Sequence, residues 1–391
     1  MNEIQLGVIT LMKSAITGEK LPLPDGFAVA DALPILKKHG IQTMGYLGAA
    51  NCGISKADPV MQSLFRDYCL SAVVNHRQLT KIQQLFTALD ENGVDYMPLK
   101  GAVLKQLYPA PELRPMADAD ILIRIEQYGC IRSVMKSLGF SEGPESDHEL
   151  IWRCDELYVE LHKHLVSCDD KKAYSYYGDC WHLANKQNGS GFRMSAEDQF
   201  VFLFNHFVKH FRNGGIGCRH VVDLWIFLRN YPEMDYAYIE QELNKLHMIE
   251  FYQNMLSLLN CWFDGCVCSK KVDFISDFIF NSGIWGDQKS HDLAENAWHV
   301  RLNESSGKGK WRCFLNRVFP GADSAAYQYP ILKKCPYLLP AVWVVRWGHI
   351  ALYTPDVMKR RFQMLDPSNN ASVAAWKKNM EYVGLGYSED L

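Results

Sequence analysis

Apolar residues recur at helical spacing through residues 1–85. Leu6 and Ile9 share one face of the first run, and the pattern resumes over 30–39 and 59–86. Apolar positions that repeat every three or four residues are typical of amphipathic helices that bury one face. The sequence therefore predicts an N-terminal helical region.

After Gly93 the pattern changes to short apolar segments bounded by glycine and proline. Segments of this length with alternating polar and apolar positions favour strands over helices. The predicted elements are strands over 94–99, 118–125, 149–154 and 157–166, and helices over 102–108 and 127–138. Together they predict a small mixed-sheet α/β domain over 86–190, which closes at the glycine-containing stretch 189–191.

Helical spacing returns over 191–391, where Ser195 and Asp198 form an N-capping pattern ahead of a phenylalanine-rich run. The apolar stretch 337–353 contains Arg346 and is shorter than a bilayer-spanning helix, so we expect a buried helix there. The chain is therefore predicted to be α+β, with a small mixed sheet flanked by N-terminal and C-terminal helical regions.

Composition narrows the class of protein. The 391-residue chain has 48% hydrophobic and 22% charged residues, which is ordinary for a folded globular protein. Its formal net charge of −3 lacks the basic excess of proteins that hold nucleic acid by phosphate neutralisation. The first residues do not resemble a signal peptide, which predicts a cytoplasmic protein that does not engage a membrane. The 12 cysteines form no paired CxxC set, so we expect reduced, mostly buried thiols.

Two aspartates share one face of the strand expected over 118–125. Side chains alternate along a strand, so Asp118 and Asp120 point one way while the intervening apolar side chains point the other. Paired carboxylates repel each other, and hard divalent ions such as Mg²⁺ relieve that repulsion. We therefore expect a metal site here, and we expect Asp120→Ala to raise the melting temperature of the metal-free protein. The alternative is a solvated strand edge.

The strand expected over 157–166 carries Glu160, His162 and His164 on one face. A carboxylate beside the aspartates could complete the same metal site, and Glu160 could also accept the proton of an attacking hydroxyl. The two histidines could instead form a zinc site, although no further nitrogen or sulfur ligand follows at a telling spacing. A third alternative is an exposed polar strand face.

A strand, a glycine turn and the start of a helix follow one another at Lys100 and Gly101. Backbone N–H groups at such a turn favour phosphate, and the lysine adds a positive charge. Arg114, in the proline-containing loop before the aspartates, could also reach a triphosphate. The alternative for Arg114 is an ordinary surface arginine.

Together these segments resemble the nucleotidyltransferase superfamily of the polymerase-β type, and more closely a poorly characterised bacterial group of nucleotidyltransferase-like proteins. The matching motifs are Leu99-Lys100-Gly101, Arg114, Asp118-Ala119-Asp120, Gly139-Phe140 and Glu160-Leu161-His162, followed by His206, His210, Arg219 and Asp223. The resemblance extends over 80–350 and includes Leu338-Leu339-Pro340 and Arg346. It departs from the superfamily at Lys100-Gly101-Ala102, where a serine hydroxyl usually holds phosphate.

The resemblance implies transfer of a nucleoside monophosphate group from an NTP, with ATP the expected donor, to a hydroxyl acceptor. It implies two Mg²⁺ ions held by Asp118, Asp120 and Glu160. The remaining nucleotide contacts that it implies are Lys100, Gly101, Arg114 and His162.

We expect the active site where the carboxylate face of the sheet meets the C-terminal helices. His206 and His210 lie one helical turn apart and are expected to line this cleft with Arg219 and Asp223. A zinc pair on this helix is the alternative, although the chain has no HExxH motif.

Two other functions are compatible with the same residues. A non-catalytic member of the fold could bind a nucleotide or a partner and transfer nothing, which the missing serine hydroxyl favours. A metal-dependent phosphohydrolase could use the same carboxylates and histidines and release inorganic phosphate. The acceptor is expected to be a small molecule or a protein rather than RNA, because the total charge is acidic.

Overall fold

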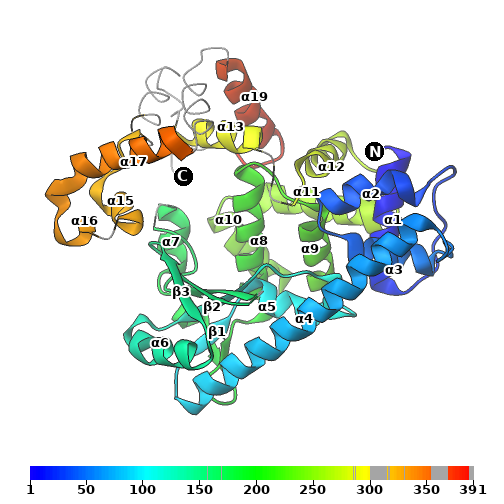
Figure 1. Ribbon diagram of the computed structural model, residues 1–391. Coiled ribbons are helices and arrows are strands. Elements are labelled where there is room, and N and C mark those ends of the chain that lie inside the picture. The colour runs from blue at the N-terminus through cyan, green and yellow to red at the C-terminus, as the bar shows by residue number, and fades with distance from the viewer. Residues whose placement is uncertain are drawn as a thin grey trace.

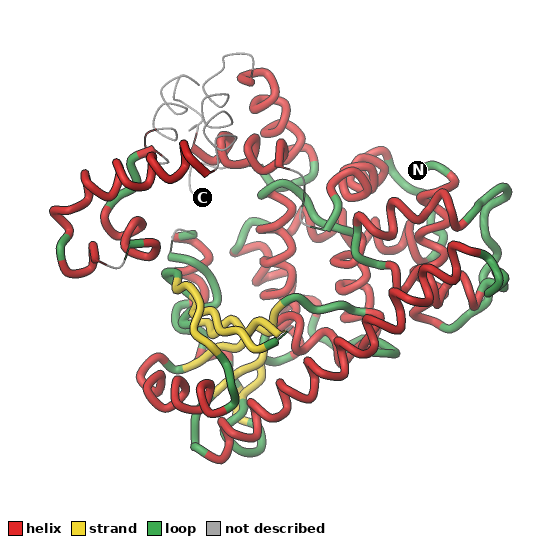
Figure 2. Tube along the Cα trace, in the orientation of Figure 1, coloured by secondary structure: helices red, strands yellow, loops and turns green. Residues whose placement is uncertain are grey.

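The computed structural model describes residues 1–155, 157–168, 170–284, 286, 288–299, 315, 318–329, 331–353 and 369–386 (Figure 1). Helices surround one five-stranded sheet (Figure 2). A small mixed sheet with helices before and after it confirms the predicted α+β class. Within the described residues, no helix combines the length and the apolar character needed to cross a membrane.

Four helices form the N-terminal part of the chain. They are α1 (Glu3–Thr17), α2 (Val29–Lys38), α3 (Gln42–Asn51) and α4 (Pro59–Glu91). Asn2 caps α1 by accepting the backbone N–H of Gln5, and Asp58 caps α4 through the N–H groups of Val60 and Met61. Figure 1 shows α4 running from the other N-terminal helices to the sheet. The helices predicted for this region are confirmed.

The sheet has the strand order β1-β2-β5-β4-β3. Its strands are β1 (Tyr96–Pro98), β2 (Asp118–Ile123), β3 (Ser141–Glu145), β4 (Glu149–Cys154) and β5 (Leu157–His162). β2 and β5 are parallel and the other neighbours are antiparallel, so the sheet is mixed. The sequence did not predict β3, because its five residues are all exposed and show no apolar alternation.

One face of the sheet is apolar and packs on α4 and on α6 (Tyr128–Ser137). Ile121 of β2 and Val159 of β5 are fully buried there, in a cluster with Leu85 of α4 and Ile131 of α6. Side chains alternate along each strand, so this burial turns the carboxylates of β2 and β5 to the opposite face.

Helices return after the sheet. They are α7 (Lys171–Tyr177), α8 (Ala196–Arg212), α9 (Cys218–Asn230), α10 (Tyr236–Lys245), α11 (Ile249–Phe263), α12 (Lys270–Ser282), α13 (Gln288–His299) and α19 (Asn369–Tyr382). Ser195 caps α8 as predicted, because its hydroxyl oxygen accepts the N–H of Asp198. A short antiparallel pair, β6 (Asn185–Lys186) and β7 (Phe192–Arg193), flanks the glycine stretch 189–191.

An apolar cluster joins the N-terminal and the C-terminal helices. Leu11 of α1 and Met44 of α3 are fully buried in it, together with Phe204 of α8 and Phe251 of α11. Burying one such side chain stabilises the fold by roughly 1.5–3 kcal/mol. The shared core fixes α8 and α9 relative to the N-terminal helices, and the domain boundaries drawn from the sequence stay a prediction.

The apolar stretch 337–353 forms α17 (Leu339–Tyr353), and the prediction that it is buried is wrong. Val344 is 74% exposed and Leu352 is 77% exposed. The helix packs instead in a small cluster with α15 (Ala322–Gln328) and α16 (Ile331–Lys334). Apolar composition predicts a helix here but does not say how much of it another element covers.

The cysteines depart from the expected set of reduced and mostly buried thiols. Cys261, near the end of α11, forms a disulfide with Cys268 in the turn that follows. Among the free cysteines described, Cys180 and Cys218 are buried, whereas Cys69, Cys130, Cys168 and Cys266 are exposed. The end of α11 and the turn after it bring these two cysteines together, although their spacing in the sequence matches no recognised motif.

Candidate functional site

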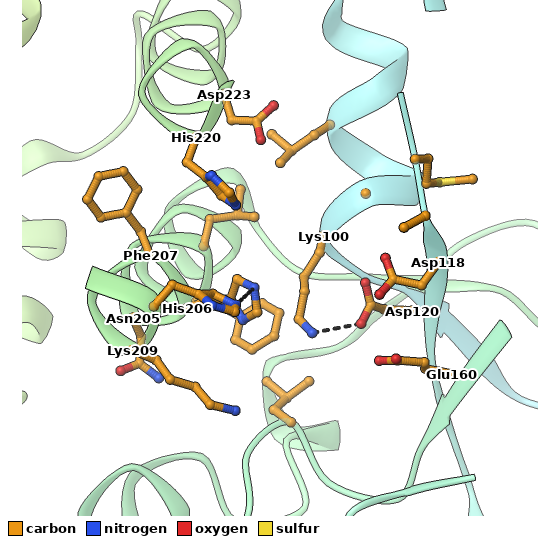
Figure 3. A pocket seen from close by; sticks show the side chains of 18 of the residues that line it. Lys100, Asp118, Asp120, Glu160, Asn205, His206, Phe207, Lys209, His220 and Asp223 are labelled. Atoms are coloured by element: carbon orange, nitrogen blue, oxygen red, sulfur yellow. Dashed lines mark hydrogen bonds and ion pairs between the residues drawn. The ribbon is translucent and has the colours of Figure 1, made fainter. Parts of the chain in front are cut away.

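The register between β2 and β5 brings the predicted carboxylates together. Asp120 lies directly opposite Glu160 across this parallel pair, and Asp118 lies opposite Tyr158. Asp118, Asp120 and Glu160 all line one cavity of about 320 Å³. The three carboxylates that were singled out from the sequence therefore share one side of one cavity (Figure 3).

The opposite side of the cavity is formed by α8 and α9. Figure 3 shows Asn205, His206 and Lys209 of α8 and His220 and Asp223 of α9 across from the carboxylates. His210 and Arg219 line the same cavity. His206 and His210 of α8 thus line the cavity opposite the sheet, where they were expected from the sequence, and their role in a site stays a prediction.

Asp120 is almost fully buried, and two side chains, Lys100 and His162, donate hydrogen bonds to its carboxylate. Its Oδ1 accepts hydrogen bonds from Lys100 Nζ at 2.7 Å and from His162 Nε2 at 2.9 Å. Burial alone would raise the pKa of Asp120, but the Lys100 ammonium and the His162 ring hold that pKa well below its usual value. Asp120 is therefore ionised and already neutralised by the protein.

Asp118 lies in the opposite electrostatic situation. Burial and repulsion from Asp120 and Glu160 raise the pKa of Asp118 to about 6, although Lys100 partly offsets this. The carboxylate face thus carries negative charge that the neighbouring side chains do not fully neutralise. Carboxylate oxygens with uncompensated charge fit a hard divalent ion such as Mg²⁺.

The turn at Lys100 and Gly101 brings the backbone close to the site. Lys100 has a left-handed φ of 35°, which costs a side-chain-bearing residue about 1–3 kcal/mol. A Cβ on Gly101 would lie 3.2 Å from Arg114 Nη1 and 3.5 Å from the Asp118 carbonyl oxygen. Glycine therefore permits the close approach of this turn to β2, and Lys100 reaches the carboxylates from α5 (Lys100–Leu104).

Arg114 is buried, so the alternative of an ordinary surface arginine is wrong. Its Nε and Nη2 donate to the two oxygens of Asp223 at 2.7 and 3.0 Å, and Tyr108 donates to the same carboxylate at 2.8 Å. This bidentate pair ties the loop before β2 to α9. Arg114 also lines the cavity, and its predicted contact with phosphate stays a prediction.

His162 is 1% exposed and lies between the carboxylates. Its Nε2 contacts Asp120 and lies 3.6 Å from Glu160 Oε2. The zinc alternative based on His162 and His164 is not supported by position, because His164 does not line the cavity and packs edge-on against Tyr174.

The α8 and α9 histidines are neutral near pH 7. Burial lowers the pKa of His210 to about 4 and that of His220 to about 3. His206 Nε2 lies 3.0 Å from His210 Nε2, a contact that requires one ring to donate and the other to accept. The wall across the cavity from the carboxylates is thus polar, and its neutral imidazoles can each donate or accept a hydrogen bond.

Four further ionisable cavity residues were not identified from the sequence: His148, Glu149, Lys209 and His220. Lys209 follows His206 by three residues, so a helical-face pattern could have found it. Glu149 pairs with His162 across β4 and β5, which only the strand register reveals. His148 stands in the turn before β4 and has no sequence signal of its own.

The profile of the family described as "Uncharacterised nucleotidyltransferase" matches residues 25–264, more than half of the chain. The chain belongs to this family. The match begins earlier and ends earlier than the 80–350 expected from motifs, and it includes both walls of the cavity. Membership of a nucleotidyltransferase family implies an NTP substrate.

Among solved structures, the chain is similar to the solution structure of the antibiotic-resistance factor ANT(2'')-Ia. The identity is 11%, the TM-score is 0.33, and the match covers 49% of this chain and 100% of that one. Comparison with curated protein sequences finds no match.

Proposed function

We propose that this nucleotidyltransferase family member moves a nucleoside monophosphate group from an NTP, with ATP the expected donor, to a hydroxyl group of an acceptor. The observation that carries the proposal is the meeting of Asp118, Asp120 and Glu160 on adjacent parallel strands at one side of the cavity. Carboxylates in this arrangement suit the two divalent ions of phosphoryl-transfer sites. Bound Mg²⁺ would neutralise the triphosphate and the departing pyrophosphate.

The side chains around the carboxylates suit the handling of a triphosphate. Lys100 now neutralises Asp120, and its Nζ would be free to contact a phosphate oxygen once a cation takes its place there. Gly101 lets the backbone approach closely, and the paired Arg114 holds the loop before β2 in place. His162 would orient Asp120 through the hydrogen bond from its Nε2.

The proposed reaction is an in-line displacement at the α-phosphorus. The acceptor oxygen forms a bond to this phosphorus, the bond to the β-phosphate oxygen breaks, and pyrophosphate leaves. Glu160 accepts the proton of the acceptor hydroxyl, as a partly exposed carboxylate beside the metal-binding pair can do. A small molecule or an exposed hydroxyl on a protein is the expected acceptor.

One observation favours a second function, nucleotide binding without transfer. Lys100 and His162 both contact Asp120 Oδ1, so one of the two oxygens that this carboxylate could offer to a metal is already engaged. The turn at Lys100 also lacks the serine hydroxyl that the superfamily uses for phosphate. A protein that keeps this internal ion pair would bind a nucleotide and leave it intact.

Incubation with α-labelled and γ-labelled ATP, with and without Mg²⁺, separates these functions. Transfer predicts pyrophosphate release and an α-labelled acceptor in a cell extract, lost by at least about a hundredfold in Asp118→Ala/Asp120→Ala. Asp95→Asn, which neutralises a carboxylate outside the cavity, is the matched control. Nucleotide binding with no pyrophosphate and no labelled product would instead establish the non-catalytic function.

A further inference from the structure

We propose a second metal site, formed by His148, Glu149 and His162, that takes Zn²⁺ or a similar divalent transition-metal ion. It lies at the β4–β5 side of the cavity, beside the aspartates and glutamate proposed to hold Mg²⁺. The proposal does not depend on nucleotidyl transfer, because its ligands and its test involve neither a nucleotide nor an acceptor.

Strand pairing brings the three ligands together. Glu149 is the direct partner of His162 across the antiparallel β4–β5 pair, and His148 precedes Glu149 in the chain. Their donor atoms lie within 4.8 Å of one another. His148 Nε2 is 3.4 Å from Glu149 Oε2. Two ligands about 2.1 Å from a tetrahedral ion lie roughly 3.4 Å apart, so this pair already has the spacing of a zinc site.

His162 supplies the second, independent observation. Its side chain is 1% exposed, and its Nδ1 is buried without a hydrogen-bond partner in the part of the chain that the structure describes. A buried polar atom left in this state costs about 1–3 kcal/mol. Because Nε2 donates to Asp120, Nδ1 is the nitrogen that remains to bind an ion.

A carboxylate orients the other histidine. His148 Nδ1 donates to Asp147 Oδ1 at 2.7 Å, which leaves the Nε2 lone pair free to face an ion. Asp147 in turn accepts from the Ser167 hydroxyl at 2.5 Å and from the Cys168 backbone N–H at 3.1 Å. Metal-binding histidines commonly have such a carboxylate on the second ring nitrogen. Asp147 and Asp120 would therefore serve as the orienting partners of the two imidazoles.

The ligand types select the ion. Two imidazoles and one carboxylate favour Zn²⁺ and similar ions over Mg²⁺, which prefers oxygen ligands. Three protein ligands leave a coordination position for water or for a group of a bound substrate, and all three residues line the cavity. The two metal sites would meet at the hydrogen bond between His162 and Asp120.

Zn²⁺ titration of the metal-stripped full-length chain, by calorimetry in excess Mg²⁺, tests the site. We expect one saturable equivalent in the wild type, weakened at least about a hundredfold in His148→Ala and in Glu149→Gln. Asp147→Asn should weaken Zn²⁺ binding about 10–100-fold. His164→Ala is the matched control, because it removes a histidine that follows β5 by two residues and lies outside the cluster, so this variant should bind Zn²⁺ as the wild type does.

Several results would overturn the site. These are the absence of saturable Zn²⁺ binding, equal binding in His148→Ala, or loss of binding in Glu160→Gln while His148→Ala binds normally. The last result would place the ion with Asp120, Glu160 and His162 instead. X-ray absorption spectroscopy of the Zn²⁺-loaded wild type tests the site without any variant. Scattering from two imidazole ligands would support the site, and a spectrum without that scattering would contradict it.

Discussion

Asp118 and Asp120 stand two residues apart on β2, yet the protein treats them differently. Asp120 is neutralised by Lys100 and His162, whereas repulsion and burial raise the pKa of Asp118 to about 6. The repulsion expected from the DxD pattern is therefore concentrated on one residue. This changes the expectation that Asp120→Ala would relieve the repulsion, because that variant would leave the half-buried Lys100 ammonium without its closest carboxylate.

Neutral variants of the two aspartates should shift metal-free stability in opposite directions. Asp118→Asn should raise the free energy of unfolding at pH 8 by about 1–3 kcal/mol, since the ionised form is disfavoured in the folded state. Asp120→Asn should lower it by about 3–5 kcal/mol, because it breaks a buried ion pair.

Denaturant unfolding at several pH values measures both effects. A raised folded-state pKa means that the wild type loses stability as pH rises through about 6, so the advantage of Asp118→Asn should disappear near pH 4. Destabilisation by Asp118→Asn at pH 8 would contradict the charge assignment.

The sequence predicted the strands that carry the carboxylates better than it predicted the contacts of those carboxylates and the remaining strand of the sheet. The alternation in β2 and β5 fixed which side chains face the cavity, and the parallel register then paired Asp120 with Glu160. Lys100 was expected to contact phosphate, and its ion pair with Asp120 could not be read from spacing. The sequence did not predict β3, because this exposed segment contains Gly143 and Pro144 and has no apolar positions that would indicate a strand.

His39 connects three helices and makes their packing sensitive to pH. It follows α2, accepts the backbone N–H of Cys218 at the start of α9 through Nδ1, and bonds the Phe280 carbonyl oxygen of α12 through Nε2. The ring must therefore be neutral, with its proton on Nε2. Burial lowers the pKa of His39 to about 4, and its side chain is fully buried.

His39 should contribute to acid unfolding. A lowered folded-state pKa means that its contribution is present above pH 6.5 and is lost as pH falls through about 4. The wild type should lose up to about 3 kcal/mol more unfolding free energy over this interval than His39→Gln does. Denaturant unfolding measures the difference, with His76→Gln, an exposed histidine of α4, as the control. Parallel profiles for the wild type and His39→Gln would contradict this role.

At the scale of the whole molecule, the cavity lies where two parts of the chain distant in sequence meet. The carboxylate face of the sheet forms one wall, and α8 and α9 form the other. The cavity thus lies where the active site was expected from the sequence, and its role as that site stays a prediction. The sequence could not show that the N-terminal helices share a core with α8 and α11, since packing between distant helices leaves no local pattern.

The exposed α17 also shows that packing between distant elements cannot be predicted from a local sequence pattern. Its apolar residues predicted a helix correctly, but their burial depends on elements elsewhere in the chain. This helix lies beyond residue 264, where the family match ends. The proposed chemistry belongs to the matched part, which contains every residue assigned to the cavity.

A thermal-shift titration measures whether the carboxylates of β2 bind an NTP through Mg²⁺, on which the proposed function rests. Each NTP is added with and without Mg²⁺ to the wild type and to Asp118→Ala/Asp120→Ala. A ligand at about 100 times its Kd stabilises the folded state by roughly 2.7 kcal/mol. We expect a Mg²⁺-dependent rise in the melting temperature of the wild type and no such rise in the double variant. No shift with any NTP, or an equal shift in the double variant, would contradict it.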